Sequence, residues 1–376
     1  MNNTLNTGLE DIAVAETRLS SIDGETGELV IRGFSINELA TDATYEETVF
    51  LLLNGRLPTG DDLAKFRAEL STHREISDEV RAVLQRAARE EKSAMDALRM
   101  GIAAANLGEE EQDAESDIRR VIAVVPTITT TYWRYRQGKE PVAPREDLRH
   151  AANYLYMLTG EEPTEAKARG LETYLNTVAD HGLNASTFSA RVVVSTESNL
   201  VSAATAAVGA LKGPLHGGAP GPVLEMLQDV YETGDPEGYV HETLHAGERL
   251  MGFGHRVYRV RDPRATVLES AAERFYEASG DADFFETAQE FEDIAIDLLT
   301  EHMPDRRLET NVEFYTAILL DGIGIPKELF TTTFAVSRVG GWMAHAREQL
   351  NNNRLIRPNA RYVGNTERSW TPIEER

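Results

Sequence analysis

The chain contains 376 residues, enough for two domains or for one large domain with an excursion, and its 41% of apolar residues excludes a disordered polypeptide. It contains no cysteine, which excludes disulfides, thiolate metal sites and a thiol nucleophile. The formal net charge is -24, and only six of the 38 basic residues are lysines.

This acid-rich, lysine-poor composition is of the haloarchaeal type, because mobile ions at high salt screen the self-repulsion of the carboxylates. It argues against nucleic acid and anionic membranes as partners, since both carry negative charge. The N-terminal sequence lacks a basic-then-apolar signal pattern, and no apolar run approaches membrane-spanning length. We therefore expect a soluble, cytoplasmic protein in which any anionic ligand requires a local reversal of the electrostatic field.

The first element expected along the chain is a short β-hairpin at residues 21–34, where apolar residues alternate after a Gly/Asp turn. Helical periodicity dominates beyond it. Thr44 and Glu47 have the spacing of a capping box, and Ser77 is a candidate N-cap. The predicted helical segments are 44–55, 77–89, 146–158, 165–180, 198–211 and 325–350.

Strands do not alternate with helices in this pattern, which favours a mostly α fold over a parallel sheet. Residues 212–222, "KGPLHGGAPGP", contain four Gly and three Pro and interrupt the helical rhythm. We interpret this segment as a hinge or domain border. The tail after Val363 is polar and is expected to be loosely held.

Three of the nine histidines, His181, His216 and His255, stand next to glycines. Glycine lets the backbone approach a ligand closely and shields the neighbouring ring little. Each of these histidines could instead satisfy the backbone of a local turn. Their occurrence in three loop-like settings favours a role in binding or catalysis.

Arginines reverse the charge of the chain in two places. Residues 249–264 contain five Arg against one acid, Asp262, and residues 354–361 contain three Arg and no acid. Arginine suits carboxylates and phosphates because its guanidinium can bind them through two hydrogen bonds. The pattern therefore predicts a multiply anionic small ligand, and the alternative is that these arginines pair with surface acids.

Glu313 lies in "LETNVEFYT", between Val312 and the aromatic pair Phe314 and Tyr315. Such neighbours can shield a carboxyl group from water and change its proton affinity. By frequency alone, Glu313 is one acid among 62.

His241 and His245 form the pattern H-E-x-x-H, which on a helix can hold zinc with the intervening Glu as general base. The extended form of the pattern is absent, because Glu248 occupies the position that requires glycine. A third ligand such as Glu269 or Glu273 is compatible with the spacing. A zinc peptidase is therefore an alternative hypothesis.

Taken together, the motifs resemble the citrate synthase family in its shorter archaeal and bacterial type. The matching segments, in order, are "GLEDIAVAETRLSSIDGETGELVIRGF", "ADHGLNAST", "GPLHGGA", "GFGHRVYRVRDPRA", "NVEFY", "SRVGGWMAHAREQ" and "NRLIRPNARYVG". The resemblance implies an all-α fold with a large domain (1–215 and 320–376), a small domain inserted at 216–319, and an obligate homodimer. It also implies condensation of acetyl-CoA with oxaloacetate and thioester hydrolysis, with no metal or organic cofactor and with the small domain closing over bound oxaloacetate.

The resemblance assigns roles to single residues. It implies that His216 stabilises the enol of the thioester, that His255 protonates the oxaloacetate carbonyl and that Glu313 is the base. The implied oxaloacetate-binding residues are His181, Arg264, Arg338 and, from the other subunit, Arg357, with Asn184 and Ser186 as support. The implied CoA-binding residues are Leu215, Met251, Gly252, Gly254 and Arg259.

Three positions depart from the usual pattern of the family. Glu313 stands where Asp is common, Pro220 where Asn is common and Val178 where His is frequent. Because a misplacement of about 1 Å can cost on the order of 100-fold in rate, we expect the backbone at Glu313 to be set back to receive the longer side chain. The rival hypotheses are a 2-methylcitrate synthase that uses propionyl-CoA and a non-catalytic, ligand-sensing homologue.

Overall fold

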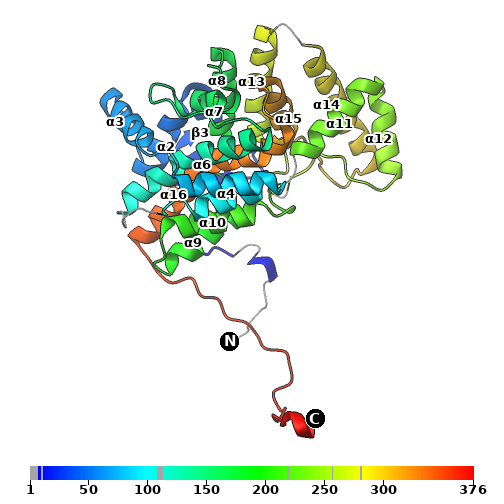
Figure 1. The fold of residues 1–376 in the computed structure, drawn as a ribbon. Helices are drawn as coiled ribbons and strands as arrows, with labels where there is room; N and C mark the ends of the chain where they lie inside the picture. Colours follow the sequence, from blue (N-terminus) through cyan, green and yellow to red (C-terminus); the bar gives the residue numbers. More distant parts are fainter. Residues whose placement is uncertain (1–6, 10–11, 108–112, 218–219, 256, 280–281) are drawn as a thin grey trace.

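The structure is a computed structural model that describes residues 7–9, 12–107, 113–217, 220–255, 257–279 and 282–376. Over these residues the chain is mostly α-helical with a small antiparallel sheet near its N-terminus (Figure 1), which confirms the predicted fold class. The helices are α1 (Ile36–Asp42), α2 (Tyr45–Asn54), α3 (Gly60–Ser71), α4 (Asp78–Arg89), α5 (Ala94–Ala103), α6 (Ala114–Arg136), α7 (His150–Thr159), α8 (Glu165–Val178), α9 (Ala185–Ser195), α10 (Leu200–Leu211), α11 (Pro220–Thr233), α12 (Pro236–His245), α13 (Pro263–Ser279), α14 (Asp283–His302), α15 (Val312–Ile323) and α16 (Phe330–Asn351). The 3-10 helices are η1 (Thr7–Leu9), η2 (Lys327–Leu329) and η3 (Ile373–Glu375), and the strands are β1 (Ser20–Asp23), β2 (Glu28–Ile31) and β3 (Phe34–Ser35).

The predicted hairpin is present and carries one additional strand. β1 and β2 pair antiparallel, with Ser20 opposite Ile31 and Asp23 opposite Glu28. β3 continues the sheet, with Phe34 opposite Ile31. The side chain of Ile31 is fully buried, so the apolar alternation of the sequence places one face of β2 against the helices.

The predicted helix signals operate as expected. Thr44 and Glu47 form a complete capping box at the start of α2, and Gly55 ends that helix with a left-handed backbone. Ser77 caps α4 by accepting a hydrogen bond from the N–H of Val80. The break at 212–222 is also present, because α10 ends at Leu211 and α11 begins at Pro220.

Helix α7 begins later than the predicted segment 146–158. Its first residue is His150, and Arg149 in the N-cap position makes no side-chain capping bond. Instead, the buried carboxylate of Glu46, from α2, accepts a hydrogen bond from the backbone N–H of His150 at 2.9 Å. The start of α7 is thus set by a tertiary contact, which satisfies an otherwise unpaired N–H group.

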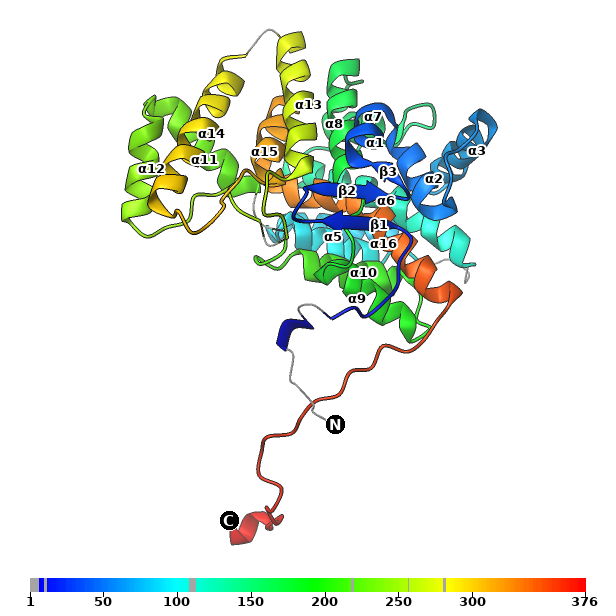
Figure 2. The same ribbon diagram turned by 180° about the vertical axis from the view of Figure 1, so that it is seen from behind.

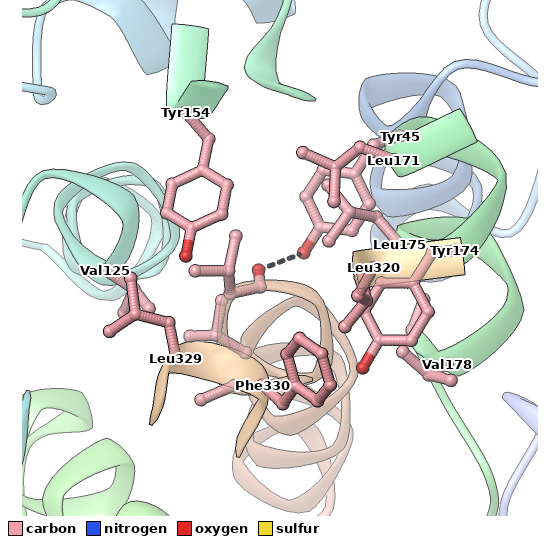
Figure 3. Packing of buried hydrophobic residues seen from close by; sticks show 14 of the residues in the cluster. Tyr45, Val125, Tyr154, Leu171, Tyr174, Leu175, Val178, Leu320, Leu329 and Phe330 are labelled. Carbon is pink, nitrogen blue, oxygen red and sulfur yellow. Dashed lines mark hydrogen bonds between the residues drawn. The ribbon is translucent and has the colours of Figure 1, made fainter. Parts of the chain in front are cut away.

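Helix α16 is the centre of the larger group of helices and packs against α2, α6, α8, α9 and α10 (Figure 2). Two buried tyrosines form hydrogen bonds to α16, and Figure 3 shows the bond from Tyr45. The Tyr45 hydroxyl donates to the carbonyl oxygens of Val336 and Ser337, 3.1 and 2.6 Å away, and the Tyr154 hydroxyl lies 2.9 Å from Oγ1 of Thr333. The core therefore holds α16 in one register, which matters because Arg338 lies on it.

Helices α11, α12 and α14 pack on one another in a lobe to one side of the larger group (Figure 1). Helices α13 and α15 pack together and connect the two parts, because both contact α8 and α15 also contacts α11. This arrangement is compatible with an inserted small domain, and the boundaries at 216 and 319 stay predictions.

The chain after α16 is extended from Asn352, stays hydrogen-bonded to Ser195 of α9 as far as Ile356, and then leaves the body as an exposed segment (Figure 2), earlier than the predicted tail after Val363. The side chains of Tyr362, Val363 and Trp370 are 70%, 85% and 79% exposed. Three large apolar side chains are therefore left uncovered on this tail. Within the described ranges, no helix is both long and apolar enough to cross a membrane.

Candidate active site

Two segments that are distant in sequence lie side by side before α15. The backbone N–H of Asn311 donates to the Gly252 carbonyl, and its side-chain Nδ2 donates to the Gly254 carbonyl, each at 2.9 Å. One segment leads into His255 and the other into Glu313. These contacts therefore fix a predicted acid and the predicted base on one framework.

The glycines of this framework are required by its geometry. Gly252 and Gly254 have φ values of 90° and 79°, a left-handed region that disfavours side chains. A Cβ at Gly252 would come within 3.0 Å of the Phe314 ring, and one at Gly254 within 2.9 Å of the Leu308 side chain. Met251 is half-buried beside them. The predicted CoA-binding backbone is thus a tightly packed loop.

Two backbone N–H groups determine which ring nitrogen of neutral His255 carries the hydrogen. Those of Val257 and Tyr258 donate to its Nδ1 at 3.0 and 3.1 Å. A neutral imidazole carries one hydrogen, which therefore lies on Nε2. Burial, together with the positive charge of Arg264, lowers the pKa of His255 to about 4. His255 is consequently a neutral Nε2–H donor at neutral pH.

Arg264 lies next to this donor and is held by Asp262, a residue that the sequence marked only as the single acid among arginines. Nε and Nη2 of Arg264 donate to the two carboxylate oxygens of Asp262 at 3.0 and 2.7 Å. Nη2 also lies 3.3 Å from Nε2 of His255. Because both of these nitrogens carry hydrogen, they are two donors that a ligand oxygen could engage together.

His216 is held as a second neutral donor. The backbone N–H of Ser186 lies 3.3 Å from its Nε2, and Ser186 Oγ lies 2.8 Å from the same nitrogen. That Oγ also lies 2.8 Å from Asn184 Oδ1 and accepts a hydrogen bond from Trp342 at 3.0 Å. An N–H can only donate, so Nε2 accepts and the hydrogen of the neutral ring lies on Nδ1. Burial and then the charge of Arg338 lower the pKa of His216, which keeps the ring neutral.

His181 lies beside His255, with the two ring centroids 5.9 Å apart. Its Nε2 is 3.0 Å from the hydroxyl of Tyr258. Burial, followed by the charges of Arg264 and Arg338, holds the pKa of His181 well below its usual value. All three predicted histidines are therefore neutral near pH 7.

Arg338 is a buried cation without a carboxylate partner among the described residues. Its side chain is 2% exposed, and its Nε donates to the Val178 carbonyl at 2.7 Å. Its guanidinium carbon lies 4.5 Å from the ring centroid of Phe334. Burial lowers the pKa of Arg338 to about 10, so the group stays charged at neutral pH. An unpaired buried charge is costly, and an anionic ligand would relieve that cost.

Glu313 lies half-buried in the first turn of α15, where its backbone N–H donates to Asn311 Oδ1 at 2.9 Å. Its side-chain carboxyl makes no hydrogen bond or ion pair within the part of the chain that the structure describes. Burial raises the pKa of Glu313 to about 7, although the positive charge of Arg264 opposes this. A carboxyl group with this pKa can take up and release protons at neutral pH.

Three predicted site residues are exposed to solvent. Arg357 is exposed on the extended tail, where its Nη1 lies 3.4 Å from Asn359 Oδ1. Arg259 and Leu215 are also exposed. Arg256 of the arginine-rich segment 249–264 lies outside the described residues, as do Gly218 and Ala219 of the glycine-rich loop.

The N-terminal hairpin connects the two histidine loops, a role for which the sequence carried no signal. Ser20 Oγ donates to Asp180 Oδ2 at 2.6 Å and accepts from the Gly182 N–H at 3.0 Å, on either side of His181. At the hairpin turn, the Gly24 carbonyl accepts a hydrogen bond from the N–H of Arg259 at 2.8 Å. The hairpin thus contributes to the positions of His181 and of the loop after His255.

Replacing Gly24 with alanine should therefore disturb the site from outside it. A Cβ at Gly24 would lie 2.3 Å from the Val257 carbonyl oxygen, so the backbone that holds His255 must shift. We expect kcat/KM to fall about tenfold, because misplacements below 1 Å already slow catalysis. Steady-state kinetics check this, with Gly60→Ala as control, since nothing lies within 4 Å of a Cβ there. Equal kinetics of the two variants would contradict the coupling.

The zincin-like pattern lies on α12. Nδ1 of His245 is 2.7 Å from the His241 carbonyl oxygen, and Glu269 is paired with Arg261 at 2.8 Å. Across the described ranges, no three His, Cys, Asp or Glu side chains gather closely enough to hold a metal ion.

Neutral imidazole donors, a carboxyl group that titrates near pH 7 and buried guanidinium groups define the class of protein. They suit a helical enzyme that moves a proton on carbon next to a carbonyl group while it holds an anionic substrate.

Comparison with known proteins identifies the family. The family described as "Citrate synthase, C-terminal domain" matches residues 8–359. The chain is 45% identical to citrate synthase of Haloferax volcanii over 386 residues, covering 100% of both chains. It is 35% identical to 2-methylcitrate synthase of Shewanella oneidensis, covering 98% of this chain and 97% of that one. The chain therefore belongs to the citrate synthase family, and it is an acyltransferase that converts the acyl group into an alkyl group on transfer.

Solved structures agree with this assignment. Citrate synthase of Pyrobaculum aerophilum matches with a TM-score of 0.88 at 38% identity, covering 98% of this chain and 94% of that one. The enzyme of Thermoplasma acidophilum, solved as a ternary complex with carboxymethyl coenzyme A and oxaloacetate, matches with a TM-score of 0.89 at 32% identity, covering 99% and 100%.

Proposed function

We propose that this chain condenses acetyl-CoA with oxaloacetate and hydrolyses the citryl thioester to citrate and CoA, with Glu313 as the base. The observation that carries the proposal is the unpaired, buried Arg338, whose charge acts on His181, His216 and Glu313. A cation placed in this way suits a substrate with carboxylates next to the reacting carbonyl. The ternary complex of the Thermoplasma acidophilum relative supports the same ligands.

In this proposal Glu313 removes a proton from the acetyl methyl group, and the C–H electrons form an enolate. Nδ1–H of His216 donates to the thioester oxygen, which stabilises the charge as it develops. The enolate carbon then attacks the oxaloacetate carbonyl, and Nε2–H of His255 supplies the proton to the new alkoxide. Water finally attacks the thioester, the C–S bond breaks, and CoA leaves as the thiol.

The remaining residues bind the substrates. His181, Arg264 and Arg338 engage oxaloacetate, and the two donors of His255 and Arg264 suit its carbonyl oxygen. The CoA-binding set comprises Leu215, Met251, Gly252, Gly254 and Arg259, with Arg259 towards the phosphates. Binding of oxaloacetate first and closure of the small domain would bring the exposed Leu215 and Arg259 closer to the site.

The rate should depend on pH through Glu313. The base acts as the carboxylate, and its pKa is raised to about 7. Below that pH the ionised fraction falls about tenfold per unit, so kcat/KM should fall in parallel and level off above pH 8. The pKa of His255 is about 4, so this group stays neutral throughout. A profile that is flat between pH 5.5 and 8 would contradict the assignment.

We further propose a homodimer in which Arg357 serves the partner's site. Its position on an extended tail that exposes Tyr362, Val363 and Trp370 supports this, because such apolar side chains are usually covered. Mixing inactive Arg357→Ala and His255→Ala subunits should restore about a quarter of wild-type activity, since half of the dimers then carry one complete site. Activity that does not return on mixing would place Arg357 in its own subunit's site.

The overall reaction is tested by CoA-thiol release from acetyl-CoA or propionyl-CoA with oxaloacetate, in high KCl with a chelator. Turnover with acetyl-CoA supports the proposal. A preference for propionyl-CoA would indicate 2-methylcitrate synthase. The two acyl-CoA substrates must be compared directly, because one methylene changes the binding free energy by only about 1–3 kcal/mol. No turnover with either acyl-CoA would indicate a non-catalytic homologue. Loss of activity caused by the chelator would support the alternative of a metal enzyme.

The proposal places the enzyme in a cytoplasm of high salt. The net charge of -24 supports it, because such a surface needs screening by ions. Activity and stability measured against KCl concentration test this part separately.

A further inference from the structure

Tyr258 contacts three predicted oxaloacetate-site residues through three different groups. Its hydroxyl lies 3.0 Å from Nε2 of His181, and its backbone N–H donates to Nδ1 of His255 at 3.1 Å. Its ring centroid lies 5.8 Å from the guanidinium carbon of Arg264. The residue is 2% exposed, so these contacts are sheltered from water.

The direction of the hydroxyl bond follows from the available acceptors. Burial raises the pKa of Tyr258, so the phenol keeps its hydrogen. Among the described residues, Nε2 of His181 is the only hydrogen-bond partner of this hydroxyl. A buried O–H without an acceptor costs about 1–3 kcal/mol. The hydroxyl therefore donates, and the hydrogen of neutral His181 lies on Nδ1.

We propose that Tyr258 is a positioning residue for oxaloacetate recognition, which holds His181 as the Nδ1–H tautomer next to His255 and Arg264. The inference rests on the proposed function for its substrate, whereas the tautomer is a property of the protein alone. Tyr258 sets the two neighbouring imidazoles in complementary forms, with Nδ1–H on His181 and Nε2–H on His255. Each ring then offers oxaloacetate one fixed donor without carrying a charge.

Tyr258→Phe tests the role of the hydroxyl, because it keeps the ring and the backbone N–H. We expect the Kd of oxaloacetate to rise about 3–10-fold, the value of one lost hydrogen bond. The KM of acetyl-CoA at saturating oxaloacetate and kcat should each change less than about twofold, since His216 keeps its contacts with Ser186 and Glu313 keeps its place at the start of α15. NMR of 15N-histidine-labelled, ligand-free protein should show Nδ1–H on His181 in the wild type and a mixture of tautomers in the variant.

Tyr154→Phe is the matched control. It also removes a buried hydroxyl, which lies 2.9 Å from Thr333 Oγ1, away from the site. This variant should bind oxaloacetate with unchanged Kd and keep the His181 tautomer. A similar loss of affinity for oxaloacetate in both variants would show that the effect of Tyr258→Phe comes from altered core packing and not from the bond to His181, and it would overturn the proposal.

The wild-type spectrum alone can also overturn it. If His181 carries its hydrogen on Nε2, Tyr258 does not donate to it and the positioning role is wrong. If His181 is the Nδ1–H tautomer but the wild type releases no CoA from either acyl-CoA, the proposed function fails while the assigned hydrogen bond stands. An unchanged Kd of oxaloacetate in Tyr258→Phe would overturn the role in recognition whatever the spectrum shows.

Discussion

Replacing Glu313 with glutamine should lower kcat by about 10²–10⁴-fold, the usual contribution of a positioned general base. Glutamine has the same size but cannot accept the methyl proton. The affinity for oxaloacetate should stay nearly unchanged, because Arg264 and Arg338 keep their places. Single-turnover kinetics and calorimetric titration of oxaloacetate measure the two quantities separately.

Stability provides an internal check on this variant. Burial raises the pKa of Glu313 from 4.5 to about 7, so folding loses stability as the pH rises through this interval and the buried carboxyl ionises. Glutamine avoids this loss, and at pH 8 the variant should unfold at the same temperature as the wild type or at a higher one. A lower kcat therefore cannot come from unfolding.

Two further variants complete the test. Glu290→Gln removes an exposed carboxylate on α14 and should leave kcat unchanged. Glu313→Asp keeps the base but shortens it by one methylene, so kcat should fall by about 10–100-fold if the backbone is set back for glutamate. Turnover retained in Glu313→Gln would show that another group is the base.

Replacing Arg338 with methionine should raise the Kd of oxaloacetate on the order of 100-fold. A hydrogen bond to a charged group contributes about 1.5–3 kcal/mol, and a guanidinium can form two with one carboxylate. The ligand-free protein should lose little stability, because the broken bond to the Val178 carbonyl is offset by removal of a buried unpaired charge. Calorimetric titration and thermal unfolding measure the two effects.

Arg338→Lys is the matched variant, since it keeps the charge and loses the planar fork. Its Kd should lie between those of the wild type and Arg338→Met. If Arg338→Met binds oxaloacetate as tightly as the wild type, the substrate carboxylates bind elsewhere and Arg264 becomes the principal anchor.

Local signals in the sequence were sufficient for several elements of the fold. The capping box of Thr44 and Glu47 and the alternation of β2 act within a few residues, so both could be predicted. The start of α7 could not, because its capping carboxylate comes from Glu46, which is distant in the chain. The additional strand β3 is two residues long, too short for a periodic pattern.

The site shows the same division. Its histidines, arginines and Glu313 could be named from motifs, because each motif is contiguous. Asp262 and Tyr258 stand within the motif of His255 and Arg264 but could not be assigned a role from it, because their roles depend on contacts with Arg264 and His181. Trp342 donates a hydrogen bond to Ser186 from another helix, and no pattern in the sequence predicts this contact.

By itself, the sequence determined the helical class of this protein, its glycine-rich break and the chemical groups available for catalysis, because these depend on residue type and short-range spacing. Only the tertiary structure decided what state those groups adopt. The neutral tautomers of His216 and His255, the pKa of Glu313 near 7 and the unpaired charge of Arg338 all depend on burial and on neighbours brought from distant segments. Desolvation and Coulomb interactions act through space, and chain order alone does not encode them.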